Sequence, residues 1–195
     1  MAKRRPKQRQ LNDGELRRVG PESLEFDAEN PRLSRANVSH LEEDDLIIFL
    51  WKEMNVEEIA LSIFSKGYFD HEPMLVIESE KYEDCFTVIE GNRRLAAVKL
   101  LLGESLQTRV RWEHGSPSAE VSEDLQEIPV VVTTREQAWQ YIGFKHVNGP
   151  KPWDALAKAE YIARVHNEFG IPLEDIPGMI GDTHAAVKRL YRGLM

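Results

Sequence analysis

The sequence predicts an α+β fold that is followed by an all-helical segment, and the change falls near Asn148. Short runs rich in β-branched residues are bounded by turn residues, which is typical of strands. They lie at residues 74–78 (MLVIE), 85–89 (CFTVI) and 128–133 (IPVVVT). Longer stretches carry apolar residues at the spacing of an amphipathic helix. They lie at residues 42–54, 56–65 and 93–102, and the residues after 152 give helical signals alone.

Shorter signals predict the remaining elements. Residues 15–27 predict a strand, a Pro-containing turn and an extended piece, and residues 110–112 predict a short strand. Residues 113–126 are polar and contain Ser, Pro and Gly, so we expect a mobile insertion there. The elements expected after that insertion are a helix at 136–144, a hinge at 149–152, a long helix at 153–169 that Gly170 ends, and a short helix, a turn at Gly181 and a second helix from Thr183.

Composition and charge limit the classes of protein to which the chain can belong. The 195 residues carry a net charge of -8 and one cysteine, Cys85, so an intrachain disulfide is excluded. No apolar stretch approaches the roughly 20 residues that a membrane helix needs, and the first residues lack the apolar core of a secretory signal. These features predict a cytoplasmic protein with no membrane partner. Residues 1–10 carry Lys and Arg and no acid, which predicts a solvated tail or a contact with nucleic acid.

The segment IEGNRRLAAVKLLLG, residues 89–103, joins a strand to a helix through a glycine and carries two arginines in the first helical turn. Cations are unfavourable there because the macrodipole makes that end of a helix partly positive. An anion would explain the pair, held by free backbone N–H groups and by the fork-shaped donors of Arg93 and Arg94. The alternative is that the arginines form ion pairs with acids such as Glu90 or Asp27. The segment lacks the glycine patterns of P-loops and dinucleotide folds.

Glu90 and the histidines are further candidates for chemistry. Glu90 lies beside the two arginines, where it could act as a general base or take part in a structural ion pair. The six histidines are scattered and have no cysteine partners at metal-ligand spacing, so no metal site is predicted.

Several motifs, taken in order, resemble those of ParB-type proteins with the ParB/sulfiredoxin-like N-terminal fold. In that family a strand runs into Gly-Glu-Arg-Arg and an alanine-rich helix, and here residues 91–97 read GNRRLAA. The family's Asn-Pro-Arg loop, its glycine-ended helix before a Pro-opened strand, and its Pro-Val-x-Val strand correspond to residues 30–32, 67–76 and 129–132. Residues 176–190 resemble the family's helix-turn-helix. The resemblance implies a small mixed sheet with flanking helices, followed by an all-helical segment.

Partition proteins of this family bind CTP, so the resemblance implies a nucleotide site in this chain. It places Gly67 and Pro73 near a base. The residues assigned to the phosphates and to the rest of the site are Gly91, Asn92, Arg93, Arg94 and Arg32. The implied cofactor is a nucleoside triphosphate, CTP or ATP, with Mg²⁺.

Departures from the family pattern bear on that cofactor. Asn92 stands where the family has Glu, and the family's Glu-Asn-x-x-Arg motif aligns with Lys145, His146 and Gly149. Mg²⁺ prefers carboxylate and phosphate oxygens, so binding of Mg²⁺-CTP in the family manner is in question. Sulfiredoxin has a cysteine in the equivalent turn, whereas Cys85 lies on the strand before it, so sulfinic acid reductase activity is excluded.

The helix-turn-helix resemblance predicts a DNA-binding surface. A recognition helix presents its first residues to base edges in the major groove. The residues expected at bases and phosphates are Thr183, His184, Ala185, Lys188, Arg189 and Arg192. Pro177 is an obstacle unless the first helix of the pair begins beside it, because proline inside a helix removes a hydrogen bond. The chain stops directly after the second helix, which we interpret as a truncation.

The predicted organisation has three parts: a basic disordered tail at residues 1–14, a ParB/sulfiredoxin-like domain at 15–147 and a helical segment at 148–195. The leading hypothesis is a ParB-like DNA-associated protein with a nucleotide- or phosphate-binding N-terminal domain. One alternative is a nucleotide-hydrolysing, phosphotransfer or nuclease enzyme on the same fold. Another is a regulatory or defence-associated module that binds a protein. A homodimer is also expected, since helix-turn-helix proteins are commonly dimeric.

Overall fold

The computed structural model describes residues 14–30, 33, 40–147, 153–182 and 184–194. A five-stranded sheet has the order β1-β5-β3-β4-β2. The pairs β1–β5 and β3–β4 are antiparallel, and the pairs β3–β5 and β2–β4 are parallel. The strands are β1 (Glu15–Val19), β2 (Leu24–Phe26), β3 (Met74–Glu78), β4 (Phe86–Glu90) and β5 (Ile128–Val132). The predicted α+β fold with a mixed sheet is confirmed.

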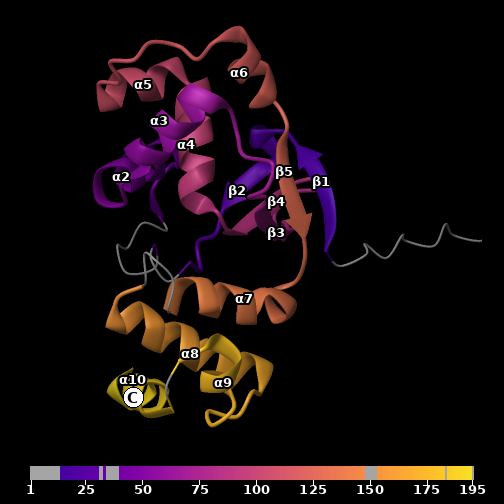
Figure 1. Ribbon diagram of the computed structural model, residues 1–195, viewed down its shortest axis with the longest axis vertical. Coiled ribbons are helices and arrows are strands. Elements are labelled where there is room, and N and C mark those ends of the chain that lie inside the picture. The colour runs from indigo at the N-terminus through magenta and orange to yellow at the C-terminus, as the bar shows by residue number, and fades with distance from the viewer. Residues whose placement is uncertain (1–13, 31–32, 34–39, 148–152, 183, 195) are drawn as a thin grey trace, which may run out of the picture.

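Helices lie on one side of this sheet and below it, and they form the end of the chain (Figure 1). A short 3-10 helix, η1, lies between β1 and β2. The helices are η1 (Pro21–Ser23), α2 (Glu43–Glu53), α3 (Val56–Lys66), α4 (Asn92–Leu102), α5 (Glu104–Val110), α6 (Ala119–Asp124), α7 (Arg135–Val147), α8 (Ala155–Phe169), α9 (Ile176–Ile180) and α10 (His184–Leu194). Within the described ranges, none of these helices has the length and apolarity to cross a membrane.

Strands β3 and β4 supply side chains to two hydrophobic cores, because alternate residues of a strand point to opposite faces. Val76 and Val88 belong to the first core, together with buried residues of α2, α3 and α4. Ile89 belongs to the second core, which contains buried residues of α7, α8, α9 and α10. Leu75 and Ile77 pack against that second core. The sheet therefore contacts both the flanking helices and the C-terminal helices.

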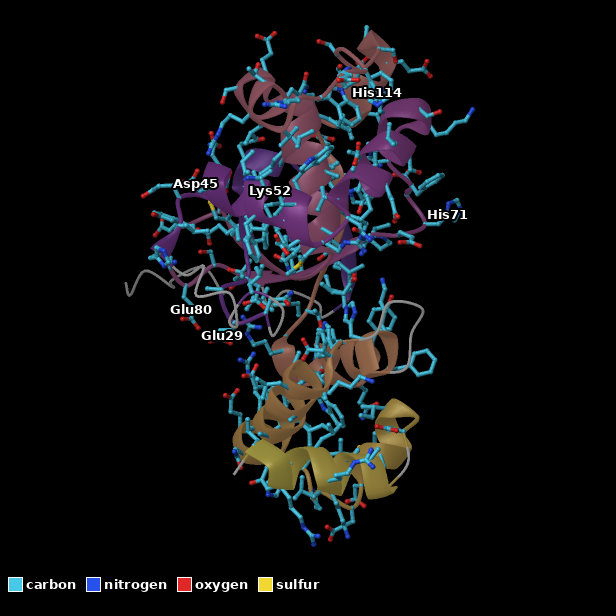
Figure 2. The ribbon with its side chains drawn as sticks, turned by 90° about the vertical axis from the view of Figure 1, so that its left-hand side faces the viewer. Glu29, Asp45, Lys52, His71, Glu80 and His114 are labelled. Atoms are coloured by element: carbon cyan, nitrogen blue, oxygen red, sulfur yellow. The ribbon has the colours of Figure 1, made fainter. Side chains whose placement is uncertain are left out.

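Ion pairs join the sheet region to α7 and α8. Asp27, directly after β2, accepts two hydrogen bonds from Arg135 at 2.7 and 3.0 Å. Glu29 lies 3.4 Å from Arg135, and its backbone carbonyl accepts a 3.1 Å hydrogen bond from Arg164 of α8. Glu29 lies at the level where the sheet region meets these helices (Figure 2). The turn after β2, residues 27–30, is thus held against both helices.

Two sequence predictions in the middle of the chain were wrong. Residues 110–112 are not a strand: Val110 ends α5, and Arg111 follows with a left-handed φ of 58°. The β-branched and aromatic residues there signal a strand locally, but the hydrogen bonds of the last helical turn override that propensity. Residues 113–126 contain α6, which Ser118 caps by accepting a hydrogen bond from Val121 N–H. Leu125 is buried in this segment, so it belongs to the packed fold.

Two of the C-terminal helices, α8 and α9, begin where the sequence contains a helix-start signal. The long helix α8 starts at Ala155 because Asp154 caps it, accepting hydrogen bonds from the N–H groups of Leu156 and Ala157 at 3.0 Å. Pro177 lies in the first turn of α9, where its missing N–H has no helical partner to lose. The expected hinge at 149–152 lies outside the described residues.

Candidate functional site

The predicted strand-turn-helix is present, and its turn requires glycine. Gly91 follows β4 with φ 109° and precedes α4. A Cβ at this position would lie 2.9 Å from Met74 Cγ, in a backbone conformation that side chains rarely adopt. The first bond of α4 runs from Leu95 N–H to the Gly91 carbonyl at 2.9 Å. The earlier N–H groups of the helix have no partner within it and point to the turn.

Asn92, the first residue of α4, has a structural role. Its side chain is buried, and its Oδ1 accepts a 3.1 Å hydrogen bond from Asp27 N–H. Its Nδ2 donates to the Val88 carbonyl at 2.7 Å. These two bonds fix the turn to the end of β2 and to β4.

Arg94 is enclosed by acceptors from the protein itself. Its Nη2 lies 2.5 Å from Glu90 Oε2, and its Nη1 donates to the carbonyl of Glu72. The same Nη1 lies 3.3 Å from the Tyr68 hydroxyl and 3.4 Å from the Pro73 carbonyl. Burial raises the pKa of Tyr68 to about 12, although Arg94 opposes that effect. Arg94 therefore ties the start of α4 to the end of β4 and to the segment between α3 and β3.

Arg93 has a different environment from Arg94. Its Nη2 donates to the Asn55 carbonyl at 2.8 Å, which joins α4 to the segment between α2 and α3. Its Nε is buried and has no hydrogen-bond partner. Burial lowers the pKa of Arg93, and the charge of Glu58 partly offsets that effect. A buried donor without a partner is costly, so Arg93 Nε is a candidate contact for a bound acceptor.

Glu90 contacts basic side chains from two helices. Besides Arg94, it lies 3.1 Å from Lys145 Nζ and 3.8 Å from His146 Nε2, both at the end of α7. Burial by itself raises the pKa of Glu90, but the charges of Arg94, Lys145 and His146 outweigh burial and lower it below its usual range. Glu90 is thus held as a carboxylate at neutral pH.

Trp153 connects this group to the C-terminal helices. Its ring stacks on the His146 ring with centroids 4.8 Å apart, and it also contacts Tyr161 of α8 at 5.0 Å. Its backbone N–H donates to the His146 carbonyl at 2.6 Å. Trp153 therefore joins the end of α7 to α8.

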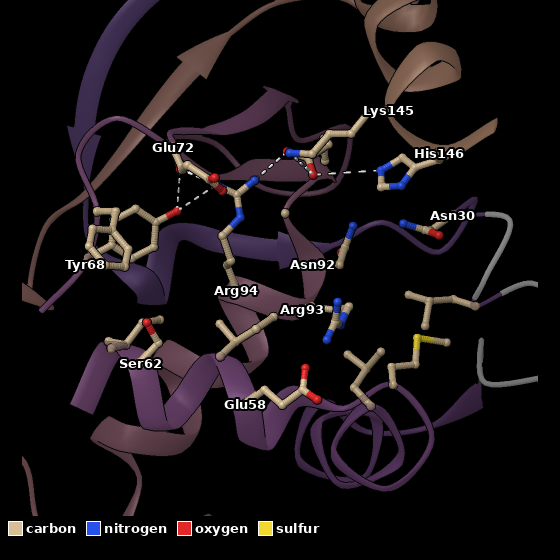
Figure 3. A pocket seen from close by; sticks show the side chains of 18 of the residues that line it. Asn30, Glu58, Ser62, Tyr68, Glu72, Asn92, Arg93, Arg94, Lys145 and His146 are labelled. Atoms are coloured by element: carbon tan, nitrogen blue, oxygen red, sulfur yellow. Dashed lines mark hydrogen bonds and ion pairs between the residues drawn. The ribbon is translucent and has the colours of Figure 1, made fainter. Parts of the chain in front are cut away.

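These side chains line one cavity of about 410 Å³ (Figure 3). Figure 3 shows Arg94 directed to Tyr68 and Glu72, and Glu58 below Arg93. One part of the lining is cationic and another is apolar or aromatic. The lining residues are Asn30, Leu33, Leu50, Met54, Glu58, Ile59, Ser62, Ile63, Tyr68, Phe69, Glu72, Glu90, Gly91, Asn92, Arg93, Arg94, Lys145, His146 and Trp153.

The predicted site residues are partly brought together. The run from Glu90 to Arg94 lines the cavity. Gly67 and Pro73 do not line it, but their neighbours Tyr68 and Glu72 do. Gly67 ends α3 with φ 77°, and a Cβ there would lie 2.8 Å from Asp124 Oδ2. Arg32 lies outside the described residues.

Sequence reasoning did not identify the polar residues that α3 supplies to the pocket. Glu58 and Ser62 lie on α3, and no local motif in that helix distinguishes them from surface residues. Lys145 and His146 were placed by alignment alone, without an ion-pair partner.

The expected DNA-binding residues lie on or before α10. Lys188, Arg189 and Arg192 are exposed. Positions three and four apart share one face of a helix, so these cations lie together. Thr183 lies outside the described residues, and His184 begins α10.

Comparisons with known proteins give structural matches alone. No family model matches the chain, and no curated protein matches it. The chain is similar to the C-terminally truncated chromosome-partitioning protein ParB from Caulobacter crescentus complexed with CTP-gamma-S, at 20% identity and TM-score 0.38, covering 93% of this chain and 79% of that one. It is also similar to the C-terminally truncated protein complexed to the centromeric parS site, at 17% identity and TM-score 0.48, covering 91% and 71%.

Both structures are of ParB, from the family that the sequence resembles. At these identities and TM-scores, the likeness concerns the fold alone.

Proposed function

We propose that this chain is a ParB-like, DNA-associated protein that binds a nucleotide or a similar phosphate ligand in the cavity beside α4. The observation that carries this proposal is the buried Arg93 Nε, which has no hydrogen-bond partner at the first turn of the helix. A phosphate oxygen accepts from guanidinium N–H groups and from the open N–H groups of a helix N-terminus. One phosphate at this position would satisfy both kinds of donor.

The rest of the cavity suits the body of a nucleotide. Its volume of about 410 Å³ lies in the range of small-molecule sites. Tyr68, Phe69 and Trp153 give the lining aromatic side chains, and aromatic faces are suitable surfaces for a base. One similar ParB structure contains CTP-gamma-S, which makes CTP the first nucleotide to test.

A thermal-shift screen of the full chain tests this part of the proposal. CTP, ATP, GTP and UTP are added in turn, each with Mg²⁺ and with EDTA. A ligand that binds only the folded state must raise the melting temperature in proportion to the logarithm of its concentration. At least one nucleotide is expected to do so. The absence of any concentration-dependent shift would reject a nucleotide site.

The exposed cations of α10 support the DNA association. Lys188, Arg189 and Arg192 lie on one side of the helix, whereas Val187 on the other side is buried in the second core. Helix α9 is joined to α10 by a turn at Gly181, whose φ is 72°. A helix held in this way by a short neighbour can present its exposed side to the major groove. The second similar ParB structure is a complex with the parS site.

Fluorescence polarisation with labelled duplex DNA tests that association at about 50 and about 200 mM salt, because phosphate contacts release counterions. Affinity is expected to fall with salt in the wild-type chain, and the salt dependence is expected to be smaller in the triple variant Lys188→Gln, Arg189→Gln, Arg192→Gln. Binding that is absent at both salt concentrations would reject this part of the proposal.

The geometry favours binding over catalysis by Glu90. A general base works best when its pKa lies near the operating pH, and the cations around Glu90 lower its pKa instead. Its carboxylate is occupied by Arg94 and Lys145. The assignment of Glu90 as a catalytic residue stays a prediction, as does the homodimer.

A further inference from the structure

The end of α7 brings Lys145 and the His146 ring to the lining of the cavity. Lys145 and His146 lie in the last turn of α7, about fifty residues after the arginine turn in sequence, and both reach Glu90 Oε1. Arg94 holds the other oxygen of the same carboxylate at 2.5 Å. Glu90 therefore lies between the cations of two helices, and Lys145 is about one third exposed at the edge of the cavity.

We infer that the cavity binds its phosphate ligand without a divalent metal ion and that Lys145 supplies the positive charge that a metal would otherwise supply. This inference rests on the proposed phosphate site. It concerns which group neutralises the negative charge of the phosphate. A phosphate site could use either a metal ion or a protein cation for this.

The residues present do not fit Mg²⁺. The ion takes carboxylate, phosphate and water oxygens in a strict octahedral arrangement. Three acids line the cavity, and each lies beside an arginine: Glu58 acts on Arg93, and Glu72 and Glu90 pair with Arg94. The second oxygen of Glu90 is paired with Lys145. A divalent ion at this carboxylate would have to displace these cations and would be repelled by them. Within the described residues, no group of three or more His, Cys, Asp or Glu side chains could hold a metal ion.

Lys145 is suited to supply positive charge in place of a metal ion. Its ammonium group has three N–H donors, so it can keep one bond to Glu90 and donate to a ligand oxygen as well. Its stem is flexible, and its Nζ lies over the Tyr141 ring at 5.6 Å, on the exposed side of α7. The ammonium group can therefore move between Glu90 and the cavity without any change in the helix.

The two cationic sides then have separate tasks. Arg93 and the open N–H groups of α4 contact the phosphate from one side, and Lys145 contacts it from the other. Addition of Mg²⁺ would not improve this arrangement. It would occupy phosphate oxygens that the protein's donors use, so affinity should stay the same or fall.

Isothermal titration calorimetry on the full chain measures this directly. CTP, ATP, GTP and UTP are each titrated in EDTA and in Mg²⁺. The nucleotide that binds is expected to do so in EDTA at least as tightly as in Mg²⁺. Binding that needs Mg²⁺, or that is at least about tenfold tighter with it, would overturn the inference and leave the proposed function intact. Failure to bind in both buffers would reject the proposed function itself.

Two variants of Lys145 show whether it supplies the charge. Lys145→Gln removes the charge and is expected to weaken binding at least about tenfold in both buffers. Lys145→Glu places a second carboxylate beside Glu90, so binding in EDTA should be lost and any remaining binding should depend on Mg²⁺. Lys52→Gln is the matched control, since Lys52 is exposed on α2 and does not line the cavity (Figure 2).

Circular dichroism and the melting temperature of each variant separate loss of folding from loss of binding. If folded Lys145→Gln and Lys145→Glu both bind in EDTA as the wild-type chain does, Lys145 has no part in the site.

Discussion

Arg93 and Arg94 are adjacent in the first turn of α4, but their guanidinium groups face different partners. Arg94 forms a 2.5 Å ion pair with Glu90, whereas Arg93 donates to the Asn55 carbonyl and keeps a buried Nε without a partner. Successive residues of a helix point about 100° apart, so neighbours in sequence reach different surroundings. The ion-pair reading of the arginine pair therefore holds for Arg94, and the anion-binding reading stays a prediction for Arg93.

The first prediction concerns stability. Arg94→Ala leaves the buried Glu90 without its nearest cation, which should lower the free energy of unfolding by about 3–5 kcal/mol. Arg93→Ala removes one bond to a backbone carbonyl and an unsatisfied donor, so its cost should be about 1 kcal/mol or less. Urea unfolding of both variants measures the difference. Equal losses in the two variants would show that the arginines do not have separate roles.

The second prediction concerns pH. The pKa of Glu90 is lowered in the fold from its ordinary 4.5, so its carboxylate stabilises the native state above that value and loses this effect as the pH falls. Glu90→Gln should therefore be clearly less stable than the wild-type chain near neutral pH, by about 3 kcal/mol. The difference should shrink below pH 4.5. Urea unfolding across this pH range measures it, and a difference that is independent of pH would contradict the ion-pair account.

The third prediction concerns the contact between the sheet and α7. Asp27 is 3% exposed and holds Arg135 by two hydrogen bonds, so Asp27→Ala should cost about 3 kcal/mol or more. Arg109 and Asp45 form an ion pair that is 43% and 50% exposed, and Arg109→Ala should cost about 1 kcal/mol or less. Thermal unfolding compares the two variants. Similar losses would mean that the buried pair does not hold the two regions together.

The fourth prediction concerns the turn before α4. Gly91→Ala forces a side chain into a left-handed conformation against Met74, which should cost about 1–3 kcal/mol. Gly193→Ala lies in α10 with open space around it, and it should stabilise the chain by about 0.5–1 kcal/mol. Melting temperatures of the two variants should therefore shift in opposite directions. A stabilising Gly91→Ala would contradict the geometry of the turn.

The sequence predicts much of the fold because its strands and helices have strong periodic signals. The strand at 85–89 and the helix at 93–102 lie within one residue of β4 and α4. The helix at 104–110 was missed because its last residues favour a strand locally. The helix also buries Leu106, and this packing favours the helical hydrogen bonds. Local propensity does not contain that information.

The site is less accessible to sequence reasoning than the fold. The pair between Glu90 and Arg94 is four residues apart on the chain, so it could be named in advance as an alternative. The contact of Glu90 with Lys145 and the pairing of Asp27 with Arg135 join residues far apart in sequence. Such contacts depend on how α7 packs against the sheet, and no motif of either segment signals its distant partner.

Calorimetric titration of CTP, ATP, GTP and UTP into the wild-type chain and into Arg93→Gln tests the central claim, that Arg93 is the protein's open donor for a phosphate. Arg109→Gln is the control, since it removes the same charge from an exposed pair outside the cavity. The account predicts at least about a tenfold loss of affinity in Arg93→Gln and none in Arg109→Gln. Wild-type affinity in a folded Arg93→Gln variant would contradict it.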